Sequence, residues 1–187
     1  IQSGVIGDLR YMETAFITSD YDLSNIRMQK ENYGGCTYDL GCYTTSQILW
    51  LTGQDPIRVQ AIAEYSPEGV DTFTTGILLF EDGWKANFTC GMVLATEQNK
   101  RLDRLQIHGT KGKLTSDVEF NQAGELSYTI TTEEGSVTKT VTAPQNYSLE
   151  VTQFGRCISE GEKPHVSNEF SRRNAKILDQ ILEKIGY

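Results

Sequence analysis

A carboxylate and a phenol stand four residues apart in the stretch from Gly34 to Tyr43, which reads GGCTYDLGCY. If this stretch begins a helix, Asp39 and Tyr43 point the same way, because positions i and i+4 share a helix face. The carboxylate can then hold a hydroxyl group while the phenol exchanges a proton. A phenol has a pKa near 10, so such work at neutral pH requires a nearby cation. The local sequence supplies no evident cation, which must therefore come from elsewhere.

The same pattern also has a purely structural interpretation. Asp39 would be a first-turn acid stabilised by the helix dipole, and Tyr43 a half-buried core tyrosine. Trp50 continues roughly their face, and Gly41 leaves the helix surface open to close approach by another group. A second, apolar face of the helix is formed by Leu40, Ile48 and Leu51. The pattern by itself leaves both interpretations open.

The composition is that of an ordinary globular domain. The chain has 187 residues, of which 38% are hydrophobic and 22% charged, enough for one domain with a core. A net charge of −8 disfavours nucleic acid as a partner. No signal peptide is visible, and no run of residues approaches the roughly 20 apolar residues of a membrane helix. The chain begins without methionine, so we expect a piece of a longer, cytoplasmic protein. The four cysteines lack C-x-x-C spacing, and we expect reduced thiols and no metal site.

Alternating patterns predict a sheet through most of the chain. Residues 4–18 read as a strand, residues 19–35 as irregular, and a helix that follows the glycine pair ends before Gly53. Seven or eight strands joined by tight turns are predicted in all, and two hairpins turn at EDG and at Glu134-Gly135. Tight turns between successive strands favour a mainly antiparallel sheet.

Two helices are predicted at the end of the chain. Residues 148–160 place Val151, Phe154 and Ile158 on one side, and Ser167 caps a final apolar-faced helix. We therefore expect an α+β fold, an open-faced sheet with helices packed on one face. The other face would need a partner because it carries a large apolar area, which we assign to Phe73, Ile77, Leu79, Trp84 and Phe88.

The stretch GGCTYDLGCY resembles the signature that opens the first helix of the C-terminal domain in the Gfo/Idh/MocA family, named after glucose-fructose oxidoreductase and inositol dehydrogenase. The common pattern is Gly-Gly, three residues, Asp, one residue, Gly, one residue, His, and here Tyr43 stands in place of the histidine. The tyrosine, and Arg27 upstream in NIRMQKENYGG, are similar to the branch with glucose-fructose oxidoreductase and dimeric dihydrodiol dehydrogenase. IHGTKGKL resembles the family's Gly-Thr-x-Gly strand turn. The segment before the last helix is also similar, at Tyr147, Glu150, Phe154, Ile158, Gly161 and Pro164.

The resemblance implies that residues 1–187 are a single C-terminal domain for substrate binding and oligomerisation. The intact protein would be an NAD- or NADP-dependent oxidoreductase acting on CH–OH groups of a sugar, polyol or dihydrodiol. This chain has no G-x-G-x-x-G, so an N-terminal Rossmann domain outside it would bind most of the cofactor. A lysine in a Glu-Lys-Pro motif of that domain would be the missing cation. The open sheet face would form a homodimer or homotetramer.

The resemblance assigns roles to three residues. Tyr43 would be the acid–base group, because a nearby lysine favours the phenolate. Asp39 would hold a neighbouring hydroxyl and orient the carbinol, while Arg27 would line the pocket or pin its loop. We expect no cofactor-binding or metal-binding residue in this chain. The alternatives are the same fold in an NAD-assisted glycosidase or a catalytically silent relative, and a non-enzymatic open-sheet assembly module.

Several motifs resemble functional sites but are interpreted as non-functional. Glu162-Lys163-Pro164 lies in a predicted solvated loop and is not the catalytic Glu-Lys-Pro. HGTKGK lacks the spacing of a phosphate loop. His108 and His165 are interpreted as structural or exposed residues.

Overall fold

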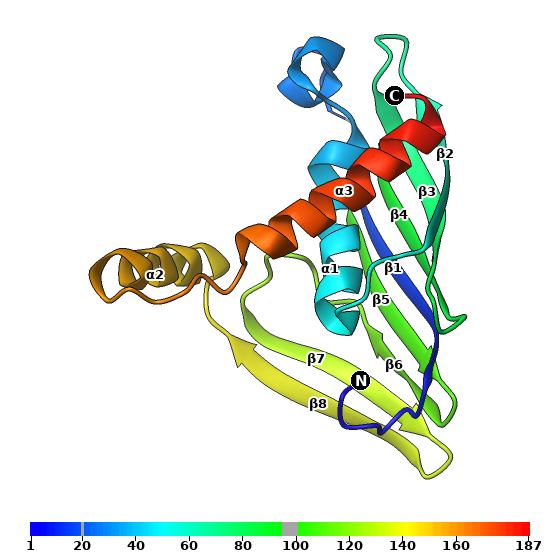
Figure 1. Cartoon of the computed structure of the whole chain (residues 1–187), viewed down its shortest axis with the longest axis vertical. Helices are drawn as coiled ribbons and strands as arrows, with labels where there is room; N and C mark the ends of the chain where they lie inside the picture. The colour runs from blue at the N-terminus through cyan, green and yellow to red at the C-terminus, as the bar shows by residue number, and fades with distance from the viewer. Residues whose placement is uncertain (20, 95–100) are drawn as a thin grey trace.

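A computed structural model of the chain describes residues 1–19, 21–94 and 101–187, which form one eight-stranded sheet with helices on one side (Figure 1). The strands are β1 (Leu9–Ser19), β2 (Arg58–Tyr65), β3 (Asp71–Leu79), β4 (Lys85–Leu94), β5 (Arg101–Gly109), β6 (Gly112–Ser116), β7 (Gly124–Thr132) and β8 (Gly135–Ala143). The α-helices are α1 (Cys42–Thr52), α2 (Asn146–Ser159) and α3 (Asn168–Ile185). Three single turns precede α1: the 3-10 turns η1 (Ile26–Met28) and η2 (Lys30–Asn32), and the π turn η3 (Thr37–Gly41).

The sheet is mainly antiparallel, which confirms the sequence prediction. Its strand order is β2-β3-β4-β1-β5-β6-β7-β8, and only the β1–β4 pair among these strands is parallel. The first strand was predicted over residues 4–18 but begins at Leu9, because Gly4 and Gly7 have positive φ angles of 71° and 73° and make turns. β1 then lies between β4 and β5, so both of its edges are paired.

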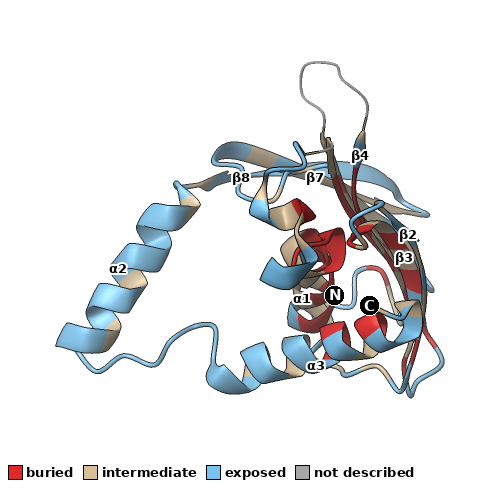
Figure 2. Ribbon diagram, turned by 90° about the horizontal axis from the view of Figure 1, so that it is seen from above, coloured by how far each residue is buried: buried red, intermediate tan, exposed pale blue. Residues whose placement is uncertain are grey.

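The core lies between the sheet and the pair α1 and α3 (Figure 2). On α3 the buried side chains follow one face of the helix, which Ser167 caps by accepting a hydrogen bond from the Phe170 N–H at 3.1 Å, as predicted. Full burial of such an aliphatic side chain contributes about 1.5–3 kcal/mol. The buried residues of α3 are Ile177, Leu178, Ile181 and Leu182.

The prediction for the uncovered sheet face was partly wrong. Trp84 and Phe88 are only 3% and 0% exposed, because the alternation of β4 directs Phe88 toward the helices and Trp84 stacks on Phe80 with ring centroids 3.7 Å apart. Phe73 and Ile77 alternate with the buried positions of β3, and Ile77 is 45% exposed. The open face therefore has less apolar surface than the sequence indicated.

Helix α2 forms where it was predicted but projects from the body of the molecule (Figure 1). Its apolar side chains Val151, Phe154 and Ile158 are 72%, 67% and 72% exposed, and none of the fourteen described residues of α2 is buried (Figure 2). Among the described residues, no helix is long and apolar enough to span a membrane.

Candidate functional site

The site begins at a loop that folds back on itself before α1. The Gly35 N–H donates to the Arg27 carbonyl at 2.8 Å, and the Gly34 N–H donates to the Gln29 carbonyl at 3.0 Å. A Cβ at Gly34 would lie 2.5 Å from the Arg27 carbonyl oxygen, closer than real Cβ contacts, so this approach requires glycine. The first glycine of the signature thus brings Arg27 beside the start of the helix.

A π turn carries Asp39. The sequence suggested one regular helical turn from Asp39 to Tyr43, but η3 is a π turn and α1 begins only at Cys42. Such wide turns occur frequently at functional sites. The prediction of helix geometry at this point was therefore wrong in detail, while the end of the helix at Gly53, with φ 68°, is confirmed.

Arg27 and Asp39 form an ion pair. Nε of Arg27 donates to Oδ1 of Asp39 at 2.8 Å, and the two side chains are 42% and 24% exposed. This hydrogen bond and the Asp39 charge raise the pKa of Arg27. The guanidinium carbon of Arg27 also lies 5.3 Å from the ring centroid of Tyr21. Partly exposed pairs add little to stability, so the pair mainly fixes the orientation of the carboxylate.

Tyr43 lies beside this pair in an aromatic setting. Its ring meets the rings of Phe16 and Phe120 edge-on, with centroids 5.5 Å and 5.7 Å away. The side chain is 37% exposed. Burial is the largest cause that raises the pKa of Tyr43, and the neighbouring groups Cys42, Tyr147, Asp39 and Glu150 raise it further. The phenol of this chain is therefore protonated at neutral pH and suited to donate a proton. To accept one, it needs a cation beyond the groups that act on it here.

Arg101 and Asp103 support this aromatic cluster, although neither was predicted from the sequence. Asp103 is 7% exposed, accepts from Arg101 Nη2 at 2.9 Å and accepts from the Phe120 N–H at 2.8 Å. Arg101 also lies 4.3 Å from the ring centroid of Phe16. The two residues fix Phe16 and Phe120, and hence the walls around Tyr43. Only their i, i+2 spacing on a strand could have marked them, and that spacing is too common to be a signal.

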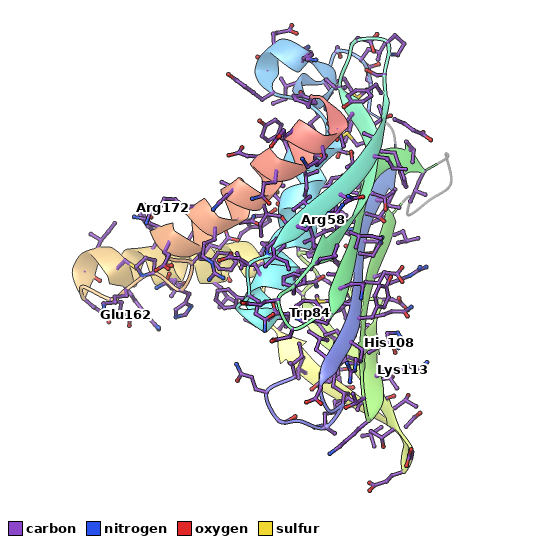
Figure 3. The ribbon with its side chains drawn as sticks, turned by 45° about the vertical axis from the view of Figure 1, so that its right-hand side comes forward. Arg58, Trp84, His108, Lys113, Glu162 and Arg172 are labelled. Atoms are coloured by element: carbon purple, nitrogen blue, oxygen red, sulfur yellow. The ribbon has the colours of Figure 1, made fainter. Side chains whose placement is uncertain are left out.

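The motifs that were interpreted as non-functional lie outside the site formed by Arg27, Asp39 and Tyr43. His108 is on β5 with its ring centroid 6.0 Å from that of Tyr11, and Figure 3 shows it with Lys113 on the sheet. Glu162 lies beside α2 in Figure 3, in an exposed loop that also carries Lys163 and His165. In the described ranges, no group of three or more His, Cys, Asp or Glu side chains is arranged to hold a metal ion.

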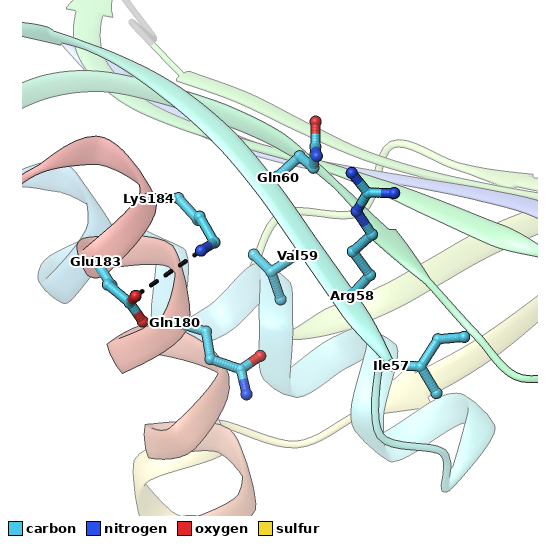
Figure 4. A pocket seen from close by; sticks show the side chains of 7 residues that line it. All are labelled: Ile57, Arg58, Val59, Gln60, Gln180, Glu183 and Lys184. Carbon is cyan, nitrogen blue, oxygen red and sulfur yellow. Dashed lines mark ion pairs between the residues drawn. The ribbon is translucent and has the colours of Figure 1, made fainter.

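A hollow of about 430 Å³ lies away from the signature helix, defined as the continuous stretch of η3 and α1, and is located between β2 and the end of α3 (Figure 4). Its lining holds one ion pair, Glu183–Lys184, whose atoms are 3.8 Å apart on neighbouring residues. The lining residues are Ile57, Arg58, Val59, Gln60, Gln180, Glu183 and Lys184. We assign no chemistry to this hollow.

Comparison with known families decides where the chain belongs. The sequence model of the GFO/IDH/MocA C-terminal domain matches residues 1–115, well over half of the chain. The chain belongs to the Gfo/Idh/MocA family. The predicted family resemblance is thereby confirmed.

Relatives within the Gfo/Idh/MocA family agree. The chain is 31% identical, over 85% of its length, to a protein of Haloferax volcanii named D-xylose 1-dehydrogenase (NADP(+)) 2. It is 28% identical over 97% of its length to a trans-1,2-dihydrobenzene-1,2-diol dehydrogenase of Xenopus laevis. These matches cover 48% and 56% of the two relatives, so the chain spans about half their length.

The fold of this Gfo/Idh/MocA chain is found in a solved structure. A 3-ketoreductase from Actinomadura kijaniata, crystallised with NADP and TDP-benzene, superposes with a TM-score of 0.88 at 21% identity. The match covers 98% of this chain and 56% of that one. At this identity the likeness supports the fold alone.

Proposed function

We propose that this chain is the substrate-binding and oligomerisation domain of an NAD(P)-dependent oxidoreductase acting on CH–OH groups of a sugar, polyol or dihydrodiol. The observation that carries the proposal is the ion pair between Arg27 of η1 and Asp39 of the signature helix, beside Tyr43, in a member of this family. The names of its relatives, a xylose dehydrogenase and a dihydrodiol dehydrogenase, support this substrate class.

The residues of this chain fit the substrate end of such a reaction. Arg27, Asp39 and Tyr43 offer donors and acceptors to a hydroxylated molecule, whereas the sequence has no G-x-G-x-x-G loop for a dinucleotide pyrophosphate. When bound by a further domain, NAD or NADP exchanges a hydride with the substrate carbon. We propose that this further domain is a Rossmann domain outside residues 1–187.

Each residue then has a distinct task. Tyr43 moves the hydroxyl proton as the carbon changes oxidation state, giving it to a carbonyl oxygen in reduction and taking it in oxidation. Asp39 accepts a hydrogen bond from a neighbouring hydroxyl and so fixes which carbon faces the hydride donor. Arg27 holds Asp39 in place through Nε, at 2.8 Å. Because its surroundings raise the pKa of Tyr43, oxidation requires a cation from the further domain.

The open sheet face supports the oligomerisation part of the proposal. Phe73 and Ile77 of β3 lie on this face, and Ile62 of the neighbouring strand β2 is 72% exposed. An apolar patch on an otherwise polar sheet favours a second copy as its cover. We propose a homodimer or homotetramer, and light scattering of an Ile62→Asp, Ile77→Asp double variant tests it. A mass unchanged from wild type would contradict this assembly mode.

The enzyme proposal is tested on the full-length protein. Purified protein is mixed with the oxidised or reduced form of NAD or NADP and a panel of aldoses, polyols, trans-dihydrodiols, their carbonyl counterparts and glycosides. Nicotinamide absorbance and release of the sugar from each glycoside are followed at neutral and alkaline pH. Net reduction of the cofactor that Tyr43→Phe abolishes supports the proposal. Cleavage of a glycoside with the cofactor returned unchanged would instead assign an NAD-assisted glycosidase. No reaction with any panel member in either direction counts against catalysis.

A further inference from the structure

A fully buried carboxylate lies directly beneath the signature helix. Asp71 is the first residue of β3 and is 0% exposed. Its Oδ2 accepts hydrogen bonds from the Thr37 N–H at 2.8 Å and from the Thr37 hydroxyl at 2.6 Å. The Thr74 hydroxyl at 2.8 Å and the Cys36 thiol at 3.1 Å donate to the same oxygen. One oxygen of a strand residue thus gathers four donors, three of which belong to the first residues of the helix.

Asp71 acts as a cap that the helix lacks in its own sequence. Cys36, at the N-cap position of η3, makes no side-chain capping hydrogen bond. The Thr37 N–H is one of the free donors at the helix start, and a carboxylate there is also favoured by the helix dipole. Asp39 follows Thr37 by two residues and Tyr43 by six. The position of both side chains therefore depends on how Thr37 is held.

The other oxygen of Asp71 faces the second glycine of the signature. A Cβ at Gly35 would lie 2.0 Å from Oδ1, so no other residue fits there while the carboxylate keeps its place. The N–H of Gly35 in turn holds the Arg27 carbonyl at 2.8 Å. Within the described ranges, Oδ1 is buried and has no hydrogen-bond partner. A buried oxygen without a hydrogen-bond partner lowers the stability of the fold. A carboxylate at this position therefore points to a role other than stability.

We propose that Asp71 is a positioning residue, which sets the geometry of the Arg27–Asp39 pair from both sides. Through Thr37 it fixes the turn that carries Asp39, and through Gly35 it fixes the loop that carries Arg27. The kinetic consequence of this inference depends on the proposed function, whereas the structural consequence does not.

The competing explanation is that Asp71 only stabilises the fold. Substitution of two buried threonines, Thr37 and Thr14, distinguishes that role from positioning. Thr37→Val is nearly isosteric, removes the hydroxyl donor to Asp71 and keeps the N–H donor. Thr14→Val is the matched control, because the Thr14 hydroxyl is also 0% exposed and donates to one side chain, Gln47 at 2.6 Å. Each variant removes one buried hydroxyl, but the Thr37 hydroxyl bonds a carboxylate and also lies 3.1 Å from the Thr74 hydroxyl, so Thr37→Val should lower the midpoint of urea unfolding somewhat more than Thr14→Val. Only Thr37→Val touches the network of Asp71.

The structural readout is the side-chain Nε–H of Arg27 in full-length protein carrying [¹⁵N]arginine, assigned by its loss in Arg27→Lys. We expect Thr37→Val to speed its hydrogen exchange about tenfold, the scale of one hydrogen bond, while Thr14→Val leaves it as in wild type. Asp71→Asn should speed it more. If the Arg27 Nε–H exchanges at the same rate in Thr37→Val and Thr14→Val, Asp71 only stabilises the fold and the inference fails. This comparison can be made even if Asp71→Asn does not fold.

The kinetic readout separates this inference from the proposed function. With an active substrate, Thr37→Val should lower kcat/KM about tenfold, since small misplacements at a reacting centre have large effects. The loss should vanish in an Arg27→Ala background, because the two changes act through one pair. Additive losses would contradict the inference. Faster Arg27 exchange in a protein that turns over no substrate would uphold the positioning role and reject the proposed function.

Discussion

Arg27 reaches Asp39 at 2.8 Å across twelve residues of sequence, because the chain between them turns back at Gly34 and Gly35. Neither glycine contributes a side chain to the pair, yet each removes a clash that would prevent it. In this chain the two glycines of the signature thus bring an arginine to an aspartate. The aspartate is then oriented beside Tyr43, whose pKa its charge raises.

Removing the arginine tests the orientation of Asp39. In the full-length protein we expect Arg27→Ala to lower kcat/KM by about 10–100-fold with a small change in stability, since the pair is partly exposed. Arg173→Ala is the matched control, because Arg173 also donates Nε to one aspartate, Asp55 at 2.9 Å. Steady-state kinetics and urea unfolding of both variants give the comparison. Equal losses of kcat/KM in the two variants would show that Arg27 has no special role.

Removing one hydroxyl tests the acid–base role of Tyr43. Tyr43→Phe keeps the edge-on contacts with Phe16 and Phe120, so the fold should be unaffected. We expect kcat to fall roughly 100-fold or more, the scale of a general acid–base group. Tyr65→Phe is the control, since among the described residues that hydroxyl bonds only a backbone carbonyl, at Ile185, and Tyr65 is similarly exposed. An unchanged kcat in Tyr43→Phe would mean that Tyr43 only lines the pocket and is not the acid–base group.

The tyrosines also predict how stability depends on alkaline pH. Burial is the main cause that raises the pKa values of Tyr38, Tyr43 and Tyr187, the last to about 12. The unfolded chain loses these protons first, so it binds fewer protons than the folded chain above about pH 10. The free energy of unfolding should therefore be constant below pH 10 with respect to these groups and fall as the pH rises from 10 to 12. Urea unfolding at several pH values measures this slope, which Tyr187→Phe should reduce. A slope that Tyr187→Phe leaves unchanged would disagree with this account.

The strands could be predicted from sequence because they depend on local periodicity, and the signature because its residues stand close together in the stretch 34–43. The sheet order was not, since β1 pairs with the distant strands β4 and β5. Trp84 was misplaced because it precedes β4 and is buried by tertiary contacts, its ring stacked on Phe80 and its Nε1–H donating to Gln54 Oε1 at 2.8 Å. Asp71 and Arg101 were not predicted, because their bonds to Thr37 and Phe120 span 34 and 19 residues. Their near partners, Thr74 and Asp103, stand at spacings that are common on strands.

The second glycine of the signature offers the sharpest test of the packing beneath the site. Gly35→Ala places a methyl group 2.0 Å from Oδ1 of Asp71 at a φ of 108°, so either the carboxylate or the loop must move. We expect a loss of unfolding free energy of about 3 kcal/mol or more, from backbone strain plus hydrogen bonds lost by a displaced carboxylate. Gly83→Ala is the control, because that glycine also has a positive φ, 79°, but a Cβ there meets nothing within 4 Å. Its cost should be the backbone strain alone, about 1–2 kcal/mol. Urea unfolding of the two variants isolates the contribution of Asp71, and equal costs would mean that the carboxylate adapts freely and does not fix the loop of Arg27.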